Sequence, residues 1–124
     1  MIFSVEIVIR IHDRLIETSG GKKGIKDINL LDSAINSIYQ AYDSKELYPI
    51  ILEIAARLCY SLNKNHAFID WNKRISMHML AVFLRFHDVN YALSNDEVIK
   101  IGLSLADGSM TYEDLVKWLK ESIQ

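Results

Sequence analysis

Charged and polar residues are concentrated in the stretch His66-Ala67-Phe68-Ile69-Asp70-Trp71-Asn72-Lys73-Arg74, which runs directly into the apolar segment 75–86. Apolar residues cover most sides of that segment, so we expect a central, buried helix that begins after a short polar loop. The first turn of a helix carries unpaired backbone N–H groups and the positive end of the helix dipole, and it is therefore suited to an anion. This stretch consequently predicts both the centre of the fold and the place of a functional site.

Apolar residues at spacings of three and four predict helices along nearly the whole chain. Start signals stand at Ser4, Asp27, Pro49, 94–97 and 111–114, and stop signals at Gly20-Gly21, near Asn63 and near Gly108. Segment 89–93 could instead be a short extended piece, and residues 1–4 an edge strand or simply a chain end. We predict an all-α fold, a compact single-domain bundle of about six helices over residues 1–124, with the helix after residue 74 at its centre.

Composition narrows the class of protein. Half of the 124 residues are apolar, which is enough for a real core. The net charge of −2 and the pI near 6.0 argue against direct binding of nucleic acid through charge. Cys59 lies in an apolar run, which favours a core residue over a nucleophile. No segment reaches the roughly 20 apolar residues of a membrane helix and no signal-peptide pattern opens the chain, so we expect a cytoplasmic protein without a membrane partner.

The polar loop combines residue types that suit phosphate chemistry. Arg74 can hold phosphate oxygens through two parallel hydrogen bonds, and Lys73 supplies a point charge. Two cations at a helix N-terminus oppose the dipole by roughly a few tenths of a kcal/mol unless an anion is bound there. Asp70 stands where an N-cap would stand and can also contact Mg²⁺. His66 can move a proton near neutral pH, although its place after a polar helix exit also fits a histidine that interacts with the helix dipole.

The loop resembles the signature of the Fic/Doc (Fido) family, His-Pro-Phe-x-Asp/Glu-Gly-Asn-Gly/Lys-Arg. The matching positions are His66, Phe68, Asp70, Asn72, Lys73 and Arg74, and the differing positions are Ala67 and Trp71. Lysine at position 73 is typical of the death-on-curing (Doc) branch. The resemblance extends over nearly the whole chain, including the early Ile-His-Asp and Gly-Gly-Lys-Lys-Gly segments.

The resemblance implies a Fido fold and the toxin of a type II toxin–antitoxin pair. Doc proteins transfer the terminal phosphoryl group of ATP to a hydroxyl of elongation factor Tu and so halt translation. The implied roles are general base for His66, orienting amide for Asn72, phosphate clamps for Lys73 and Arg74, Mg²⁺ contact for Asp70 and loop anchor for Phe68. Two alternatives stay open: AMP transfer of the Fic type, and a catalytically attenuated homologue that binds an antitoxin.

Control of such an activity is expected to come from another chain. Some Fic proteins inhibit themselves through a helix bearing Ser/Thr-x-x-x-Glu-Gly/Asn, but the segment 109–114 here lacks the final Gly or Asn. We therefore expect a short antitoxin whose disordered tail folds as a helix in a groove on the bundle. Trp71 replaces a small residue beside the anion site, where an inward indole would narrow the site and an outward one could stack on a base or a partner. Of these, we favour attenuation.

Overall fold

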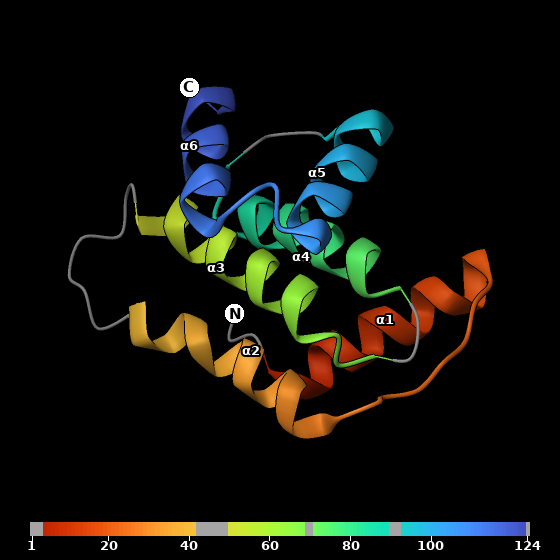
Figure 1. The fold of residues 1–124 in the computed structure, drawn as a ribbon. Helices are drawn as coiled ribbons and strands as arrows, with labels where there is room; N and C mark the ends of the chain where they lie inside the picture. The colour runs from red at the N-terminus through yellow and green to blue at the C-terminus, as the bar shows by residue number, and fades with distance from the viewer. Residues whose placement is uncertain (1–3, 42–49, 69–70, 90–92, 124) are drawn as a thin grey trace.

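Six helices form the described part of this computed structural model, which covers residues 4–41, 50–68, 71–89 and 93–123 (Figure 1). They are α1 (Val5–Ser19), α2 (Ile28–Ala41), α3 (Ile50–Asn65), α4 (Asn72–Phe86), α5 (Asn95–Asp107) and α6 (Tyr112–Ser122). The predicted all-α architecture is confirmed. One cluster of buried side chains draws residues from all six helices, while the assignment of residues 1–124 to a single domain stays a prediction.

The helices begin and end at the signals that the sequence carries. Ser4, Ser94 and Thr111 each accept a hydrogen bond from a backbone N–H in the first turn, and the last two complete reciprocal capping boxes. Gly20 and Gly108 follow α1 and α5 at φ of +84° and +86°, a region that glycine enters without a steric penalty. Helix α3 ends at Asn65, two residues later than expected. The predictions for Pro49, for most of 89–93 and for residues 1–3 lie outside the described residues.

Helix α4 is the buried helix that the apolar run predicts. Figure 1 shows α3 and α4 as a middle layer, with α1 and α2 on one side and α5 and α6 on the other. The buried residues of α4 are Ile75, Ser76, Met77, Met79, Leu80, Phe83 and Leu84. Burial of each large apolar side chain contributes roughly 1.5–3 kcal/mol. This central position fixes the first turn of α4 in the packed core. The connection between α3 and α4, which carries the motif and is called the motif loop below, leads directly into that turn.

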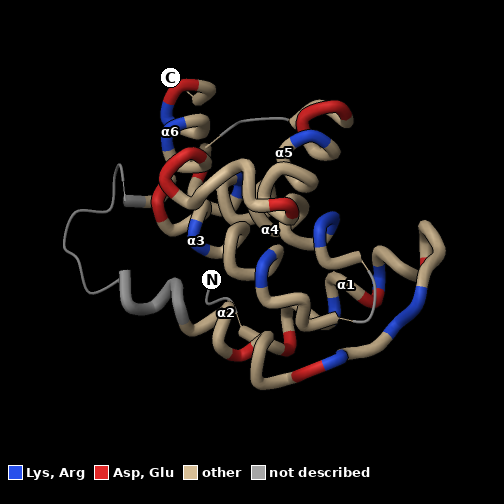
Figure 2. The backbone as a smooth tube through the Cα atoms, viewed as in Figure 1, with Lys and Arg blue, Asp and Glu red and all other residues tan. Residues whose placement is uncertain are grey.

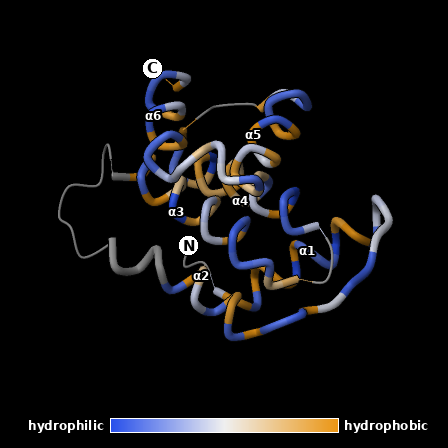
Figure 3. The backbone as a smooth tube through the Cα atoms, in the orientation of Figure 1, coloured by the Kyte–Doolittle hydropathy of each residue, from blue (hydrophilic) through white to orange (hydrophobic). Residues whose placement is uncertain are grey.

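Polar and apolar residues segregate as expected for a bundle. Apolar positions recur along the tube in Figure 3, and Figure 2 shows Lys and Arg interspersed with Asp and Glu. Cys59 is fully buried, and burial raises the pKa of its thiol to about 12, which confirms a core residue rather than a nucleophile. Within the described ranges, no helix has both the length and the apolar character needed to cross a membrane.

Candidate active site at the start of helix α4

The side chain of Asn72 closes the motif loop on itself. Its Oδ1 accepts a hydrogen bond from the backbone N–H of Phe68 at 3.0 Å, and its Nδ2 donates to the backbone carbonyl of Phe68 at 2.9 Å. The Asn72 amide thus binds the peptide group before Phe68 through its oxygen and the peptide group after Phe68 through its nitrogen. The predicted orienting role of Asn72 fits this geometry, with the loop backbone as the group that is oriented. A contact between Asn72 and nucleotide stays a prediction.

Phe68 anchors the loop in the core, as predicted. Its side chain is 2% exposed, and its ring lies flat against the imidazole of His12 in α1, with centroids 3.9 Å apart and planes 8° apart. His12 itself is fully buried. His12 is buried at the same helical spacing as Val8 and Ile16 in α1, but nothing in the sequence indicated that it lies under the motif loop.

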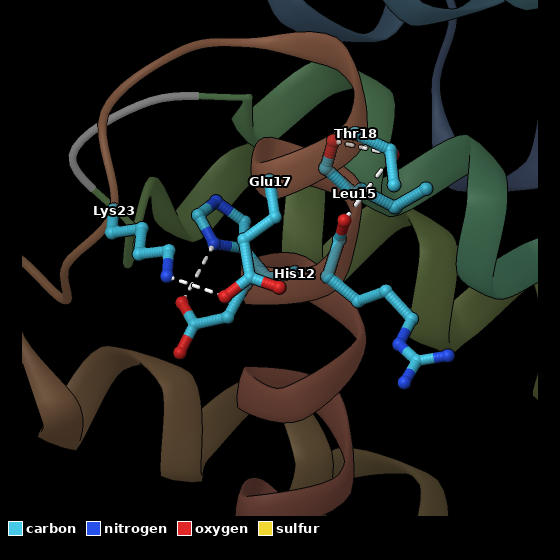
Figure 4. Close-up of polar contacts among 7 residues, drawn as sticks. His12, Leu15, Glu17, Thr18 and Lys23 are labelled. Atoms are coloured by element: carbon cyan, nitrogen blue, oxygen red, sulfur yellow. Dashed lines mark hydrogen bonds and ion pairs between the residues drawn. The ribbon is translucent and has the colours of Figure 1, made fainter.

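The segment before α2 supports the loop from a second side. The backbone N–H groups of Lys26 and Asp27 donate to the carbonyl of Ala67 at 2.7 and 3.1 Å, and Ile25 forms an isolated antiparallel bridge with Phe68. Upstream in the same connection, Lys23 pairs with Glu17 at 2.6 Å on the exposed surface (Figure 4). Residues about 40 positions apart in sequence therefore share the task of fixing this loop.

His66 stands at the entrance to the loop. It follows the last residue of α3 directly and adopts φ +51°, the left-handed conformation that ends a helix. Its side chain is exposed, so the imidazole is open to a substrate hydroxyl. Its place at the exit of α3 is as predicted, and the role of general base stays a prediction.

The N-cap of α4 is not the expected aspartate. The N-cap residue is Trp71, in the left-handed conformation at φ +71° and ψ +19°, without a side-chain capping bond. The prediction of Asp70 as N-cap is wrong because the turn into the helix is made one residue later. A left-handed position is one that glycine adopts freely, which gives a backbone reason for the small residue of the family signature. Asp70 lies outside the described residues, so its predicted Mg²⁺ contact has no described geometry.

Two cations occupy the first turn of α4. Lys73 and Arg74 are exposed, and the first turn of α4 contains no acidic residue. In the described part of the chain neither of them forms a salt bridge. The guanidinium of Arg74 lies 4.8 Å from the centre of the Trp71 ring, in a cation–π contact. Positive charge without a salt bridge among the described residues, together with the backbone N–H groups of a helix end, makes this a suitable place for a phosphate group.

A groove of about 610 Å³ extends from this helix end along α4. Its lining comes from α1, α4 and α5 and from the residues just before α4 and α5: Leu15, Trp71, Arg74, Met77, His78, Ala81, Arg85, Leu93, Asn95, Val98 and Ile99. His78, one turn after Arg74, lines the same groove, and Arg85 lines it further along α4. Burial first, and the charge of Arg85 second, lower the pKa of His78. The sequence did not reveal that α5 supplies the opposite wall, because that wall depends on tertiary packing.

Comparison with known proteins agrees with the geometry of the loop. The model of the Fic/DOC family matches residues 2–84. Toxin Doc of Mycolicibacterium smegmatis (strain ATCC 700084 / mc(2)155) is 34% identical over 77 residues, which are 62% of this chain and 59% of the relative. The aligned region therefore spans about three fifths of that relative's length. The chain belongs to the Fic/DOC family.

Proposed function

We propose that this protein is a Doc-like toxin that transfers the terminal phosphoryl group of ATP to a hydroxyl of elongation factor Tu. The observation that carries the proposal is the first turn of α4, where Lys73 and Arg74 stand exposed, no acidic residue is present, and the N-cap residue Trp71 forms no side-chain capping bond. A triphosphate presents the charge that this helix end lacks. The exposed His66 lies at the other end of the same loop, seven residues before Lys73, the first cation of α4.

The reaction needs positioning and neutralisation of charge more than covalent chemistry. His66 takes the proton of the target hydroxyl, whose oxygen attacks the γ-phosphorus of ATP. The bond from that phosphorus to the bridging oxygen breaks, and ADP leaves with the electron pair. Arg74 binds phosphate oxygens in a bidentate manner and Lys73 balances charge, while Asn72 keeps the loop backbone in place.

Mg²⁺ fits this site only as a companion of the nucleotide. In the described residues no group of three or more His, Cys, Asp or Glu side chains gathers to hold a metal ion. Asp70 is the residue of the loop that would contact the ion, and the phosphates of ATP would supply most of the remaining ligands. When bound, Mg²⁺ would neutralise charge on the phosphate oxygens.

The test is transfer of label from ATP to purified elongation factor Tu. We expect label from γ-³²P ATP to appear on the target, with a mass increase of one phosphate in the intact protein. Label from α-³²P ATP with a mass increase of one AMP would instead establish the Fic-type reaction. His87→Ala is the matched control for His66→Ala because His87 is a partly exposed histidine just beyond the far end of α4. Absence of both labels from a folded native protein would refute transferase activity on this target.

The groove along α4 supports the proposed antitoxin partner. It offers apolar contacts from Leu15, Met77 and Val98, and positive charge from Arg74 and Arg85. An amphipathic helix with acidic residues at its edges complements both properties. Expression of this chain alone in the bacterial cytoplasm should slow growth. Coexpression of the neighbouring open reading frame should restore the normal growth rate. Normal growth at high soluble expression, without a copurifying partner, would refute the toxin assignment.

A second candidate function is an attenuated Doc homologue that mainly binds its antitoxin. Trp71 is the observation that favours it, because a large side chain occupies a left-handed position, lines the groove and lies against Arg74. An indole that holds the guanidinium reduces the freedom of Arg74 to follow a phosphate group. Higher labelling of the target by Trp71→Gly than by the native chain would support attenuation.

A further inference from the structure

The contact between His12 and Phe68 joins α1 to the motif loop through two buried rings. His12 is fully buried and Phe68 is 2% exposed. Their centroids are 3.9 Å apart and their planes are nearly parallel, at 8°. We propose that His12 is a positioning residue, whose ring face fixes Phe68 and thereby the backbone that carries His66. The part of this inference that concerns turnover rests on the proposed function.

Phe68 is held through both its backbone and its ring. Within the described residues, the backbone N–H and carbonyl of Phe68 are both bound by Asn72, and the carbonyl of the preceding Ala67 is bound from the segment before α2. The ring of Phe68 is the third attachment, and α1 supplies it through His12. Any movement of that ring is passed to a backbone that is otherwise clamped. Only Ala67 separates Phe68 from His66.

A flat ring at position 12 fixes the orientation of the Phe68 ring, which an aliphatic side chain of similar volume does not. Parallel rings at van der Waals distance prevent each other from tilting, whereas a branched aliphatic chain permits several ring orientations. At the edge of the imidazole, Nδ1 lies 3.8 Å from Oδ1 of Asp13, which is beyond hydrogen-bond distance, so the restraint on Phe68 comes from the stacked ring face (Figure 4). Because a displacement of about 1 Å at a reacting group lowers turnover roughly 10²-fold, small tilts matter.

The experiment compares His12→Phe, which keeps a flat ring, with His12→Leu, which does not. Both are made in a Trp118→Phe background, where Trp71 is the one remaining tryptophan of the chain. Trp71 lies three residues after Phe68, so quenching of its fluorescence by acrylamide reports the conformation of the loop without any assay of activity. Turnover and KM for ATP are measured with elongation factor Tu, and thermal unfolding is recorded for each variant.

We expect quenching of Trp71 to increase in the Leu variant and to stay closer to the native value in the Phe variant. We expect kcat of the Leu variant to fall roughly tenfold to a hundredfold, with KM for ATP within about twofold of native. The matched control is His87→Leu, because His87 also contacts a phenylalanine, Phe83, at 4.5 Å but lies beyond the other end of α4. That control should change neither quenching nor kcat.

Native quenching and native kcat in a folded Leu variant would overturn the proposal. A folded Phe variant with losses equal to those of the Leu variant would also overturn it, because the ring face would then not be what matters. If the Leu variant does not fold, the Phe variant alone decides. Quenching and kcat close to native then support the proposal, and a large change in both overturns it. If the native chain transfers no label, the Trp71 signal still tests the position of the loop, so failure of the proposed function is distinguished from failure of this inference.

Discussion

Replacement of Asn72 by Ala tests whether one side chain holds the motif loop. The substitution removes two hydrogen bonds, of 3.0 and 2.9 Å, and leaves a partly buried N–H and a partly buried carbonyl of Phe68 without that partner. At about 0.5–1.5 kcal/mol for each bond, the free energy of unfolding should fall by roughly 1–3 kcal/mol. For a chain of 124 residues, an unfolding entropy of about 2.1 cal/mol/K per residue converts this loss into a decrease in Tm of roughly 4–11 °C.

The assay is thermal unfolding by circular dichroism, together with amide hydrogen exchange at Phe68. Exchange of the Phe68 amide should become faster because its acceptor is lost. The matched control is Asn36→Ala, which removes an exposed bond of 3.1 Å from Asn36 to Asp32 in α2 and should change the free energy of unfolding by less than about 0.5 kcal/mol. An Asn72→Ala protein with native Tm and native exchange at Phe68, or a control with an equally large loss, would refute the reasoning.

Three further predictions address the chemistry and the charge of the site. His66→Ala should lower turnover roughly 10²–10⁴-fold with native Tm, as expected for loss of a general base, and phosphate transfer at the native rate would contradict the mechanism. Arg74→Ala should raise KM for ATP, and Arg74→Lys should restore little of the affinity, because lysine cannot form the bidentate contact; full rescue by lysine, measured by titration with ATP, would contradict that role. His78→Gln should reduce the loss of stability between pH 7.5 and pH 5.5. The lowered pKa of folded His78 means that the unfolded chain, with an ordinary value of 6.5, binds protons first, so this histidine favours unfolding as the pH falls through that window. His87, whose pKa is also lowered chiefly by burial, acts in the same direction and remains in both proteins, so thermal unfolding at the two pH values isolates His78.

Local signals in the sequence predicted the helices well. Ser94 with Glu97, Thr111 with Asp114 and the glycine at position 108 are short-range devices, and each acts within one or two turns of the chain. The apolar run after Arg74 likewise specified a buried helix, because few solvent-exposed helices are apolar on most sides. Such features are readable from sequence because the physics that fixes them is itself local.

The features that sequence reasoning missed depend on distant residues or on exact backbone dihedrals. The stacking of His12 on Phe68 joins positions 56 residues apart, and no periodicity predicts it. The bond of Ala67 to the segment before α2 is likewise long-range. Asp70 was expected to cap α4 because capping preferences favour aspartate over tryptophan, but the left-handed Trp71 moved the helix start by one residue. Family resemblance identified the motif, whereas its supports required tertiary structure.

One wall of the groove along α4 lies inside the region that matches the family model, and the opposite wall lies outside it. Arg74, His78 and Ala81 lie inside residues 2–84, which match the family model, whereas Val98 and Ile99 in α5 lie outside that match. Helix α5 is nevertheless joined to the family-matched part, since Asn63 donates to the carbonyl of Gly102 and Lys64 to that of Leu105, both at 3.1 Å. A substitution of Val98 or Ile99 would therefore change the lining of this groove without altering any residue of the family-matched region, and the two hydrogen bonds from α3 would still hold α5 in place.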